Sequence, residues 1–386
     1  MEGKTYPRIY LAIDNCFAYK RWTRPEEWCS LIAQLGVNYA EASADTELDP
    51  LYMGAGYLSD WIPAVEKAAA SAGICIANLY SGHGTYTTLG LTHTDLRVRR
   101  RMIDEWFKPM ITGAARLHAG LGFFAHAFPH ETLQNADRYE EMAGLLRRGL
   151  VELNQFASSC GCGVLGIEQM YSPHQYPWTM AQTKTLLRRV TKESGRPFYF
   201  TEDLGHHHTK FQRPPEDMVR NIKTVSSAGQ NPLPRGLWLG SDRAFALAEA
   251  GAAGELAAEL DRIPHLFAEE KDGNCYAWLS ELGCYSPIIH LQQTDGHTSS
   301  HLPFTGELNQ WGIIDGGRVL AALKAAYDRP EEGQMPGRCD AVYMTLELFT
   351  GAAAIPRDVL EDIRESVAYW RRWIPRDGMY LNELTG

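Results

Sequence analysis

The sequence has no excess of positive charge. Its 386 residues include 37 Lys and Arg against 47 Asp and Glu, which gives a formal net charge of -10. Proteins that neutralise the phosphates of DNA or RNA usually present a basic surface. We therefore expect no nucleic acid partner, and hydrolysis of nucleic acid phosphodiesters is disfavoured as a function.

Long apolar runs and dense cysteine patterns are also missing. No stretch approaches the roughly 20 apolar residues that span a bilayer, and the start MEGKTYPRIYLAIDN lacks the features of a signal peptide. We expect no membrane partner and a cytoplasmic location. Eight cysteines are too sparse for a disulfide framework, and the Cys160 and Cys162 pair has no second pair to complete a zinc site. Most of the cysteines should be buried, reduced thiols.

Apolar runs with strand character alternate with runs that have helical spacing. The strand-like runs begin near residues 8, 37, 74, 116, 163, 197, 287 and 341. The helical runs cover 25–36, 60–73, 94–113, 136–159, 180–190, 319–327 and 358–373. Such alternation predicts parallel strands joined by helices, and eight strands close a barrel. We predict an α/β fold, a (β/α)8 TIM barrel forming a single domain over 1–386.

An open, doubly wound sheet is the alternative to the barrel. No G-x-G-x-x-G follows the first predicted strand, and no G-x-x-x-x-G-K occurs, so nucleotide-binding motifs do not support it. One connection is unusually long, since Asp203 and Gln292 are 89 residues apart where a βα unit needs about 30. We predict an inserted segment at about 209–273. It could be a lid, supply a ninth strand or form an oligomer contact, which leaves a homo-oligomer possible.

Four polar residues each stand at the end of a different strand-like run. They are Glu168, Asp203, Gln292 and Glu347. In a parallel barrel these side chains converge on one mouth, where oxygen ligands from separate strands can hold a divalent metal. Other polar residues near the predicted strand ends are candidates for substrate binding: Asp14, His83, His126, His206, Asp295 and His297. For His206, a role in fixing Asp203 is an equally good interpretation.

Four segments around these residues resemble the xylose isomerase-like barrel superfamily, which includes sugar phosphate isomerases and epimerases such as tagatose 3-epimerase. They are GIEQMYSP, FTEDLGHH, IIHLQQTDG and YMTLELF. The resemblance implies a divalent ion, commonly manganese, held by Glu168, Asp203 and Glu347. It also implies that Glu168 and Glu347 act as the catalytic acid and base.

The third strand of this set departs from the family pattern. Aligning its H-x-x-D spacing on Asp295 puts Gln292 where the family has histidine, whereas His290 lies two residues earlier. We predict that Gln292 is the ligand, because His290 should lie one layer deeper in the barrel as a packed, hydrogen-bonded residue. An amide oxygen in place of imidazole favours Mn²⁺ or Mg²⁺, with Co²⁺ as a further possibility.

These features predict an enzyme that acts on a small sugar. The leading hypothesis is a metal-dependent ketose or ketose phosphate 3-epimerase or isomerase, which removes a proton next to a carbonyl through a metal-stabilised enediolate. A lyase on the same scaffold, like an inosose dehydratase or an enzyme that eliminates from 3-oxo-glycosides, begins with the same step. A non-catalytic barrel subunit is a third possibility.

Overall fold

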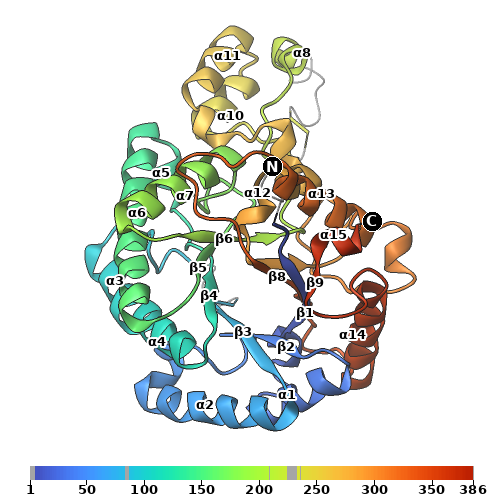
Figure 1. Ribbon diagram of the computed structural model, residues 1–386. Coiled ribbons are helices and arrows are strands. Elements are labelled where there is room, and N and C mark those ends of the chain that lie inside the picture. Colours follow the sequence, from blue (N-terminus) through green and yellow to red (C-terminus); the bar gives the residue numbers. More distant parts are fainter. Residues whose placement is uncertain (1–4, 83–86, 208, 224–232, 235, 386) are drawn as a thin grey trace.

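The computed structural model describes residues 5–82, 87–207, 209–223, 233–234 and 236–385. Within these residues, eight parallel strands follow one another around a closed barrel, in which β1 pairs with both β2 and β8 (Figure 1). The predicted (β/α)8 barrel is therefore confirmed. The strands are β1 Arg8–Asp14, β2 Tyr39–Ser43, β3 Cys75–Tyr80, β4 Gly120–Phe123, β5 Leu165–Glu168, β6 Tyr199–Asp203, β7 Ile288–Leu291 and β8 Ala341–Leu346.

Helices cover the outside of the barrel. The larger ones are α1 Pro25–Gln34, α2 Pro50–Ala72, α3 Leu96–Arg101, α4 Lys108–Arg116, α6 Ala136–Cys160, α7 Met180–Ser194, α12 Cys275–Leu282, α13 Gly316–Asp328 and α14 Pro356–Arg371. The strand predicted from residue 116 begins later, because Arg116 still belongs to α4 and His118 turns the chain with a φ of 55°. None of the described helices is long and apolar enough to cross a membrane.

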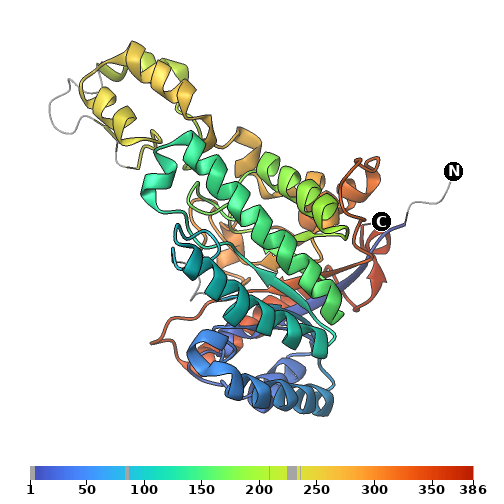
Figure 2. The same ribbon diagram turned by 90° about the vertical axis from the view of Figure 1, so that its left-hand side faces the viewer.

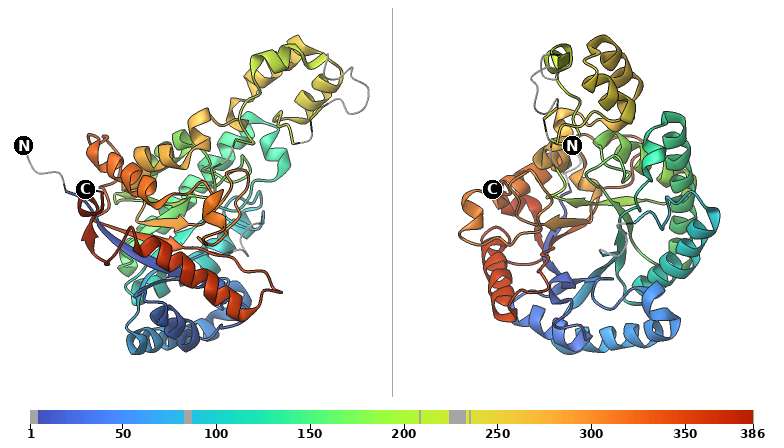
Figure 3. Two further views of the ribbon diagram at one scale, coloured as in Figure 1. Left: turned by 90° about the vertical axis from the view of Figure 1, so that its right-hand side faces the viewer. Right: turned by 180° about the vertical axis from the view of Figure 1, so that it is seen from behind.

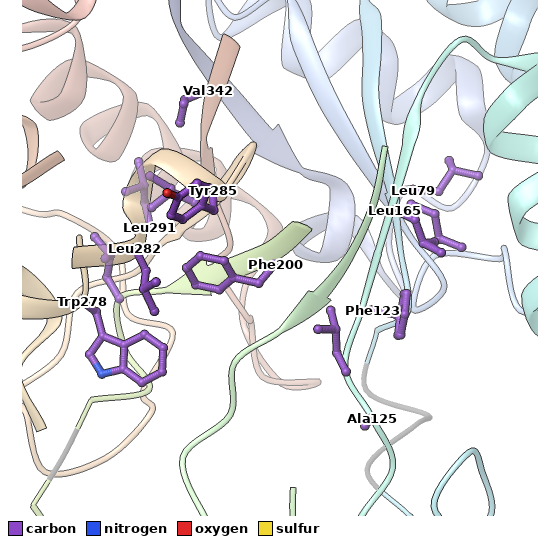
Figure 4. Packing of buried hydrophobic residues seen from close by; sticks show 14 of the residues in the cluster. Leu79, Phe123, Ala125, Leu165, Phe200, Trp278, Leu282, Tyr285, Leu291 and Val342 are labelled. Atoms are coloured by element: carbon purple, nitrogen blue, oxygen red, sulfur yellow. The ribbon is translucent and has the colours of Figure 1, made fainter. Parts of the chain in front are cut away.

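The core lies between the strands and these helices. Phe200 of β6 packs on Trp278 of α12, with ring centroids 6.4 Å apart, and Figure 4 shows both beside Leu282 and Leu291. Successive strand residues point to opposite faces of a sheet. Because Phe200 points outward to the helix layer, Asp203 points into the barrel. The apolar alternation that builds the core therefore aims the polar strand ends inward.

The segment between β6 and β7 is helical in its described part. It carries α8 Glu216–Arg220, α10 Asp242–Glu249 and α11 Ala253–Arg262, which extend away from the barrel as an arm (Figure 2). The apolar run at 237–240 in its middle forms no strand. Ser241, which follows it, caps α10 by accepting a hydrogen bond from Ala244 N. A lid or an oligomer contact stays a prediction for this arm.

A ninth strand comes from another place in the chain. β9, Met379–Tyr380, pairs antiparallel with Arg8 and Ile9 at the beginning of β1. The backbone N–H of Leu11 also donates to Asp377 Oδ1 at 2.9 Å. Figure 3 shows this last, red part of the chain beside the dark-blue strand β1. Among the described residues, the ninth strand of the sheet thus comes from the end of the chain and not from the inserted segment.

Candidate metal centre

Four buried side chains from neighbouring strands meet inside the barrel. Glu168 ends β5, Asp203 ends β6, His290 lies in β7 and Glu347 follows β8. One potential ligand atom from each lies within 4.8 Å of the others, and all four residues are at most 3% exposed. We call these residues the four-residue cluster. The structure thus brings together the three predicted carboxylates and adds a histidine that was expected to lie deeper.

His290 is surrounded by carboxylates. Its Nε2 lies 2.8 Å from Glu41 Oε1, and its Nδ1 lies 3.2 Å from Glu168 Oε1 and 3.1 Å from Glu347 Oε2. Burial by itself lowers the pKa of His290, but the carboxylates, Glu347 first, raise it well above its ordinary value overall. Both ring nitrogens are therefore engaged with acidic partners. The prediction of a packed, hydrogen-bonded residue describes its environment well.

The orientation of Gln292 does not suit a metal ligand. Its Nε2 lies 2.8 and 2.9 Å from the two carboxylate oxygens of Asp203. Its Oε1 accepts a hydrogen bond from the backbone N–H of His301 at 2.6 Å. An amide binds a cation through its oxygen, and here that oxygen faces a fixed backbone donor. Gln292 as the third ligand therefore stays a prediction, and this orientation of its amide does not favour it.

Close packing also holds Gln292 in place. A Cβ at Gly205 would lie 2.1 Å from Gln292 Cδ. Any larger residue at position 205 would thus displace the amide. The Gly205 backbone N–H donates to Asp203 Oδ1 at 2.7 Å as well. The glycine therefore lets the chain after β6 pass close to both side chains.

His206 lies beside the four-residue cluster, as predicted. Its Nδ1 is 2.9 Å from the backbone oxygen of Gln169, so the N–H on Nδ1 donates to that carbonyl. Its Nε2 is then directed toward Asp203, 3.3 Å from Oδ2. Gln169 itself bonds the backbone of Asp203 twice, at 2.8 and 2.9 Å. These contacts position the Asp203 carboxylate and agree with the interpretation of His206 as its fixing partner.

His301 joins this region from the loop after β7. Its Nδ1 lies 3.4 Å from Glu347 Oε2. A ring nitrogen of His301 also forms a group with Asp203 and His206 whose ligand atoms lie within 4.8 Å of one another. No sequence pattern singles out His301, because it belongs to no strand or helix and follows no periodic spacing.

The two glutamates of the four-residue cluster differ in proton affinity. Burial raises the pKa of Glu168, and the hydrogen bond from His290 only partly opposes it. Burial also acts to raise the pKa of Glu347, but His290 and then His301 outweigh it and hold this pKa well below the ordinary value. Tyr80 donates its O–H to Glu168 Oε2. Two carboxylates with separated proton affinities suit acid and base roles.

Strands β1 to β3 add a second layer of buried polar groups. Asp14 Oδ1 accepts from Cys16 N at 2.6 Å, and burial, then the nearby Glu41 and Glu347, raise the pKa of Asp14 well above its ordinary value. Asn78 Nδ2 donates to Glu41 Oε2 at 2.5 Å. The even-numbered spacing of Asn78 and Tyr80 in β3, which puts both on one face, is the signal that could have identified them.

The remaining predicted site residues lie elsewhere. His126 packs against Gly90, where a Cβ would be 1.9 Å from its ring, and burial lowers its pKa to about 3. Asp295 and His297 are exposed, with Asp295 Oδ1 accepting from His297 N at 2.8 Å. The structure does not bring these three into the four-residue cluster. His83 lies outside the described residues.

The chain was compared with protein families, with curated proteins and with solved structures. No protein family model matches the chain. A D-erythrulose 1-phosphate 3-epimerase from Brucella abortus (strain 2308) is 32% identical over 114 residues, which is 29% of this chain and 33% of that protein. The match therefore spans about a third of the length of this curated relative.

Two solved structures match over nearly the whole chain. A candidate xylose isomerase from Rhodospirillum rubrum ATCC 11170 has a TM-score of 0.64 and 20% identity, covering 94% of this chain and 99% of its own. A D-psicose 3-epimerase from Clostridium cellulolyticum H10, solved with D-tagatose, has a TM-score of 0.54 and 13% identity, covering 94% and 98%. The barrel, its order of strands and these matches show that the chain has the fold of the xylose isomerase-like TIM barrel superfamily.

Proposed function

We propose that this protein is a divalent-metal-dependent enzyme that epimerises or isomerises a small ketose or its phosphate. The observation that carries the proposal is the four-residue cluster, in which three carboxylates and an imidazole lie within 4.8 Å of one another. Buried carboxylates at this separation repel one another unless a cation or protons intervene. The cluster therefore suits a divalent cation in the buried interior of the barrel.

The donor set fits such an ion. Carboxylate oxygens are ligands for Mn²⁺ and Mg²⁺, and imidazole extends the range to Co²⁺. Two buried atoms directed at this region, His206 Nε2 and Glu347 Oε2, form no well-aligned hydrogen bond within the described part of the chain. They lie at ion-pair distance from their neighbours, His206 Nε2 3.3 Å from Asp203 Oδ2 and Glu347 Oε2 3.1 Å from His290 Nδ1. Buried polar atoms without a well-formed hydrogen bond commonly face a water molecule or an ion. We propose Mn²⁺ as the resident metal, with Glu168, Asp203 and Glu347 among its ligands.

Glu168 and Glu347 are the residues proposed to move protons. They come from β5 and β8, on different sides of the barrel, so they can approach a bound sugar from two directions. One carboxylate removes the proton next to the carbonyl and the other returns a proton. Return to the opposite face of the same carbon gives an epimer, whereas return to the adjacent carbon gives an isomer. When bound, a divalent ion polarises the sugar carbonyl.

The comparisons support a sugar as the substrate. The curated relative is a 3-epimerase for D-erythrulose 1-phosphate, and the D-psicose 3-epimerase was solved with D-tagatose. Both names describe chemistry at the third carbon of a ketose. A 3-epimerase is therefore the form of the reaction that we favour for this chain.

Proton exchange in deuterated water tests this function. The protein loaded with Mn²⁺ is incubated separately with D-tagatose, D-psicose and D-erythrulose 1-phosphate, and the products are followed by NMR. We expect deuterium at the third carbon together with the epimeric sugar. The Glu168→Gln, Glu347→Gln double variant is the control and should show neither. Elimination products would favour a lyase, and absence of exchange with Mn²⁺, Mg²⁺ and Co²⁺ would overturn the proposal.

A further inference from the structure

The loop after β7 returns to the end of its own strand. Gln293 and Leu302 form an antiparallel bridge, with hydrogen bonds of 2.7 and 3.2 Å between their backbones. One residue before the returning Leu302, the N–H of His301 donates to Gln292 Oε1 at 2.6 Å. One hydrogen bond of the His301 backbone and two of its neighbour Leu302 therefore hold this part of the loop beside the end of β7. A loop residue held so closely occupies a defined position.

The ring of His301 is also held in one orientation. Its Nε2 lies 3.1 Å from Ser299 Oγ, and its ring packs edge-on against Phe349, with centroids 4.3 Å apart. The Nδ1 then lies 3.2 Å from Gln292 Nε2 and 3.4 Å from Glu347 Oε2. The backbone adopts a φ of 47°, which is unfavourable for a residue with a Cβ. Such strain persists where the surrounding contacts impose it, and it is frequent at functional sites.

His301 has the contacts of a histidine that binds a metal. A metal-bound histidine usually donates its second ring N–H to an oxygen of the protein, and this bond fixes the ring. Ser299 Oγ can accept from Nε2. The Nδ1 lone pair then faces the amide nitrogen of Gln292 at 3.2 Å, beside Glu347 Oε2 at 3.4 Å, and a metal ion bound there would take the place of the Gln292 donor. His290 differs, because both of its ring nitrogens contact carboxylates and its side chain is fully buried. His301 is 9% exposed, on the side from which a sugar must enter.

We propose that His301 supplies the imidazole ligand of the metal centre and that Gln292 is a positioning residue for it. This inference rests on the proposed function and assigns one of its ligands. Gln292 links His301 to Asp203, since its amide oxygen accepts from the His301 backbone while its nitrogen donates to the Asp203 carboxylate. His290 then supports Glu168 and Glu347 from inside the barrel. The ligand set is Glu168, Asp203, His301 and Glu347.

Pulsed electron paramagnetic resonance of bound Mn²⁺ tests the assignment without any sugar, because a directly bound imidazole nitrogen couples to the electron spin. We expect one such coupling in the wild-type protein. His301→Ala should remove it and raise the Kd for Mn²⁺ at least about tenfold, the smaller end of the effect of losing even an outer contact. His290→Ala is the matched control and should keep the coupling.

The possible outcomes separate this inference from the proposed function. If the nitrogen coupling persists in His301→Ala and disappears in His290→Ala, the inference fails while the metal centre stands. If the wild-type protein binds no Mn²⁺, both fail. Thermal unfolding of the metal-free variants checks that each is folded. Should His301→Ala not fold, His301→Gln gives the same test, because an amide oxygen ligand has no directly bound nitrogen.

A double-mutant cycle tests the role of Gln292. Gln292→Ala should weaken Mn²⁺ binding in the wild-type background but have little further effect when His301→Ala is already present. The coupling of the two losses would show that Gln292 acts through His301. Additive losses, with an unchanged nitrogen signal in Gln292→Ala, would show that Gln292 acts independently and would overturn its positioning role.

Discussion

The two halves of the barrel use buried acidic residues differently. In the half formed by β5 to β8, Glu168, Asp203 and Glu347 bring their carboxylates together within reach of one ion. In the half formed by β1 to β4, the Glu41 carboxylate accepts a hydrogen bond from Asn78 Nδ2 at 2.5 Å and lies 2.8 Å from His290 Nε2. The carboxylates of the first half are clustered, although each also contacts other side chains, whereas Glu41 in the second half is paired with an amide and an imidazole. The same residue type therefore serves two purposes in one barrel.

His290 connects the two halves. We call the half formed by β1 to β4 the supporting half and the half formed by β5 to β8 the ligand half. One ring nitrogen of His290 contacts Glu41 of the supporting half, and the other contacts Glu168 and Glu347 of the ligand half. A change in the supporting half should therefore reach the metal centre through this ring. Comparing substitutions in the two halves measures how far the centre depends on its support.

The largest effect is expected in the ligand half. Glu347→Gln keeps an oxygen that can bind metal but removes the group that transfers a proton. Turnover with a ketose should fall by about two to four orders of magnitude while Mn²⁺ binding is largely kept. Glu168→Gln should behave alike. Near-normal proton exchange in both variants, measured by NMR in deuterated water, would make these residues ligands without a role in proton transfer.

A smaller effect is expected in the supporting half. Glu41→Gln removes the charge that faces His290 Nε2, so the free energy of unfolding should fall by about 1.5–3 kcal/mol. The Kd for Mn²⁺ should rise by about tenfold, since the disturbed ring no longer orients Glu168 and Glu347. Glu47→Gln is the control, because Glu47 is exposed and bonds Tyr57 at 2.6 Å. Equal effects of both variants in chemical denaturation would show that the halves are independent.

The free energy of unfolding of the protein should depend on pH through His126, which follows β4 in the supporting half. Burial lowers its pKa to about 3, whereas an unfolded histidine has a pKa of about 6.5. Between these values the unfolded state binds the extra proton, so stability is lost as pH falls below about 6.5, by roughly 2 kcal/mol at pH 5. His126→Gln should remove this part of the pH dependence. An unchanged slope in denaturation between pH 7 and 5 would show that His126 does not cause it.

The smallest effect concerns a contact between the halves. Tyr80 of β3 donates its O–H to Glu168 of β5. Removing a donor from a carboxylate raises its pKa, so Tyr80→Phe should move the acidic limb of the pH–rate profile upward by less than about one pH unit, with a few-fold loss of turnover at neutral pH. Tyr57→Phe is the control at the surface and should leave the profile unchanged. A profile that does not move in Tyr80→Phe would separate Glu168 from the observed titration.

The sequence predicted the residues whose position follows from a strand. Glu168, Asp203 and Glu347 each end an apolar run, and the period of two in a strand decides which face they occupy. His290 and Gln292 share that face, so periodicity could not choose between them. The choice depends on the direction of one amide, which the N–H of a distant loop residue determines.

Strand periodicity could predict neither the position of His301 nor the helices of the inserted arm. His301 reaches the centre because a loop folds back on Gln293, and that return depends on tertiary contacts rather than on local sequence. In the arm, the run at 237–240 before Ser241 has the composition of a strand but pairs with no strand in the part of the arm that the structure describes. Its serine instead starts a helix. Composition alone therefore misjudged this segment.

The pairing of β1 has a consequence for synthesis on the ribosome. β1 pairs with β2 at Ile13 and Asp14, whereas its pairing with β8 extends from Arg8 to Ile13 and β9 binds its first residues. The partner strand in β8 is made more than 300 residues later, which at about 5–20 residues per second takes roughly 15–70 s. For that time the apolar strand RIYLAID has an unpaired edge. The nascent chain should therefore depend on a chaperone that shields this segment until β8 emerges.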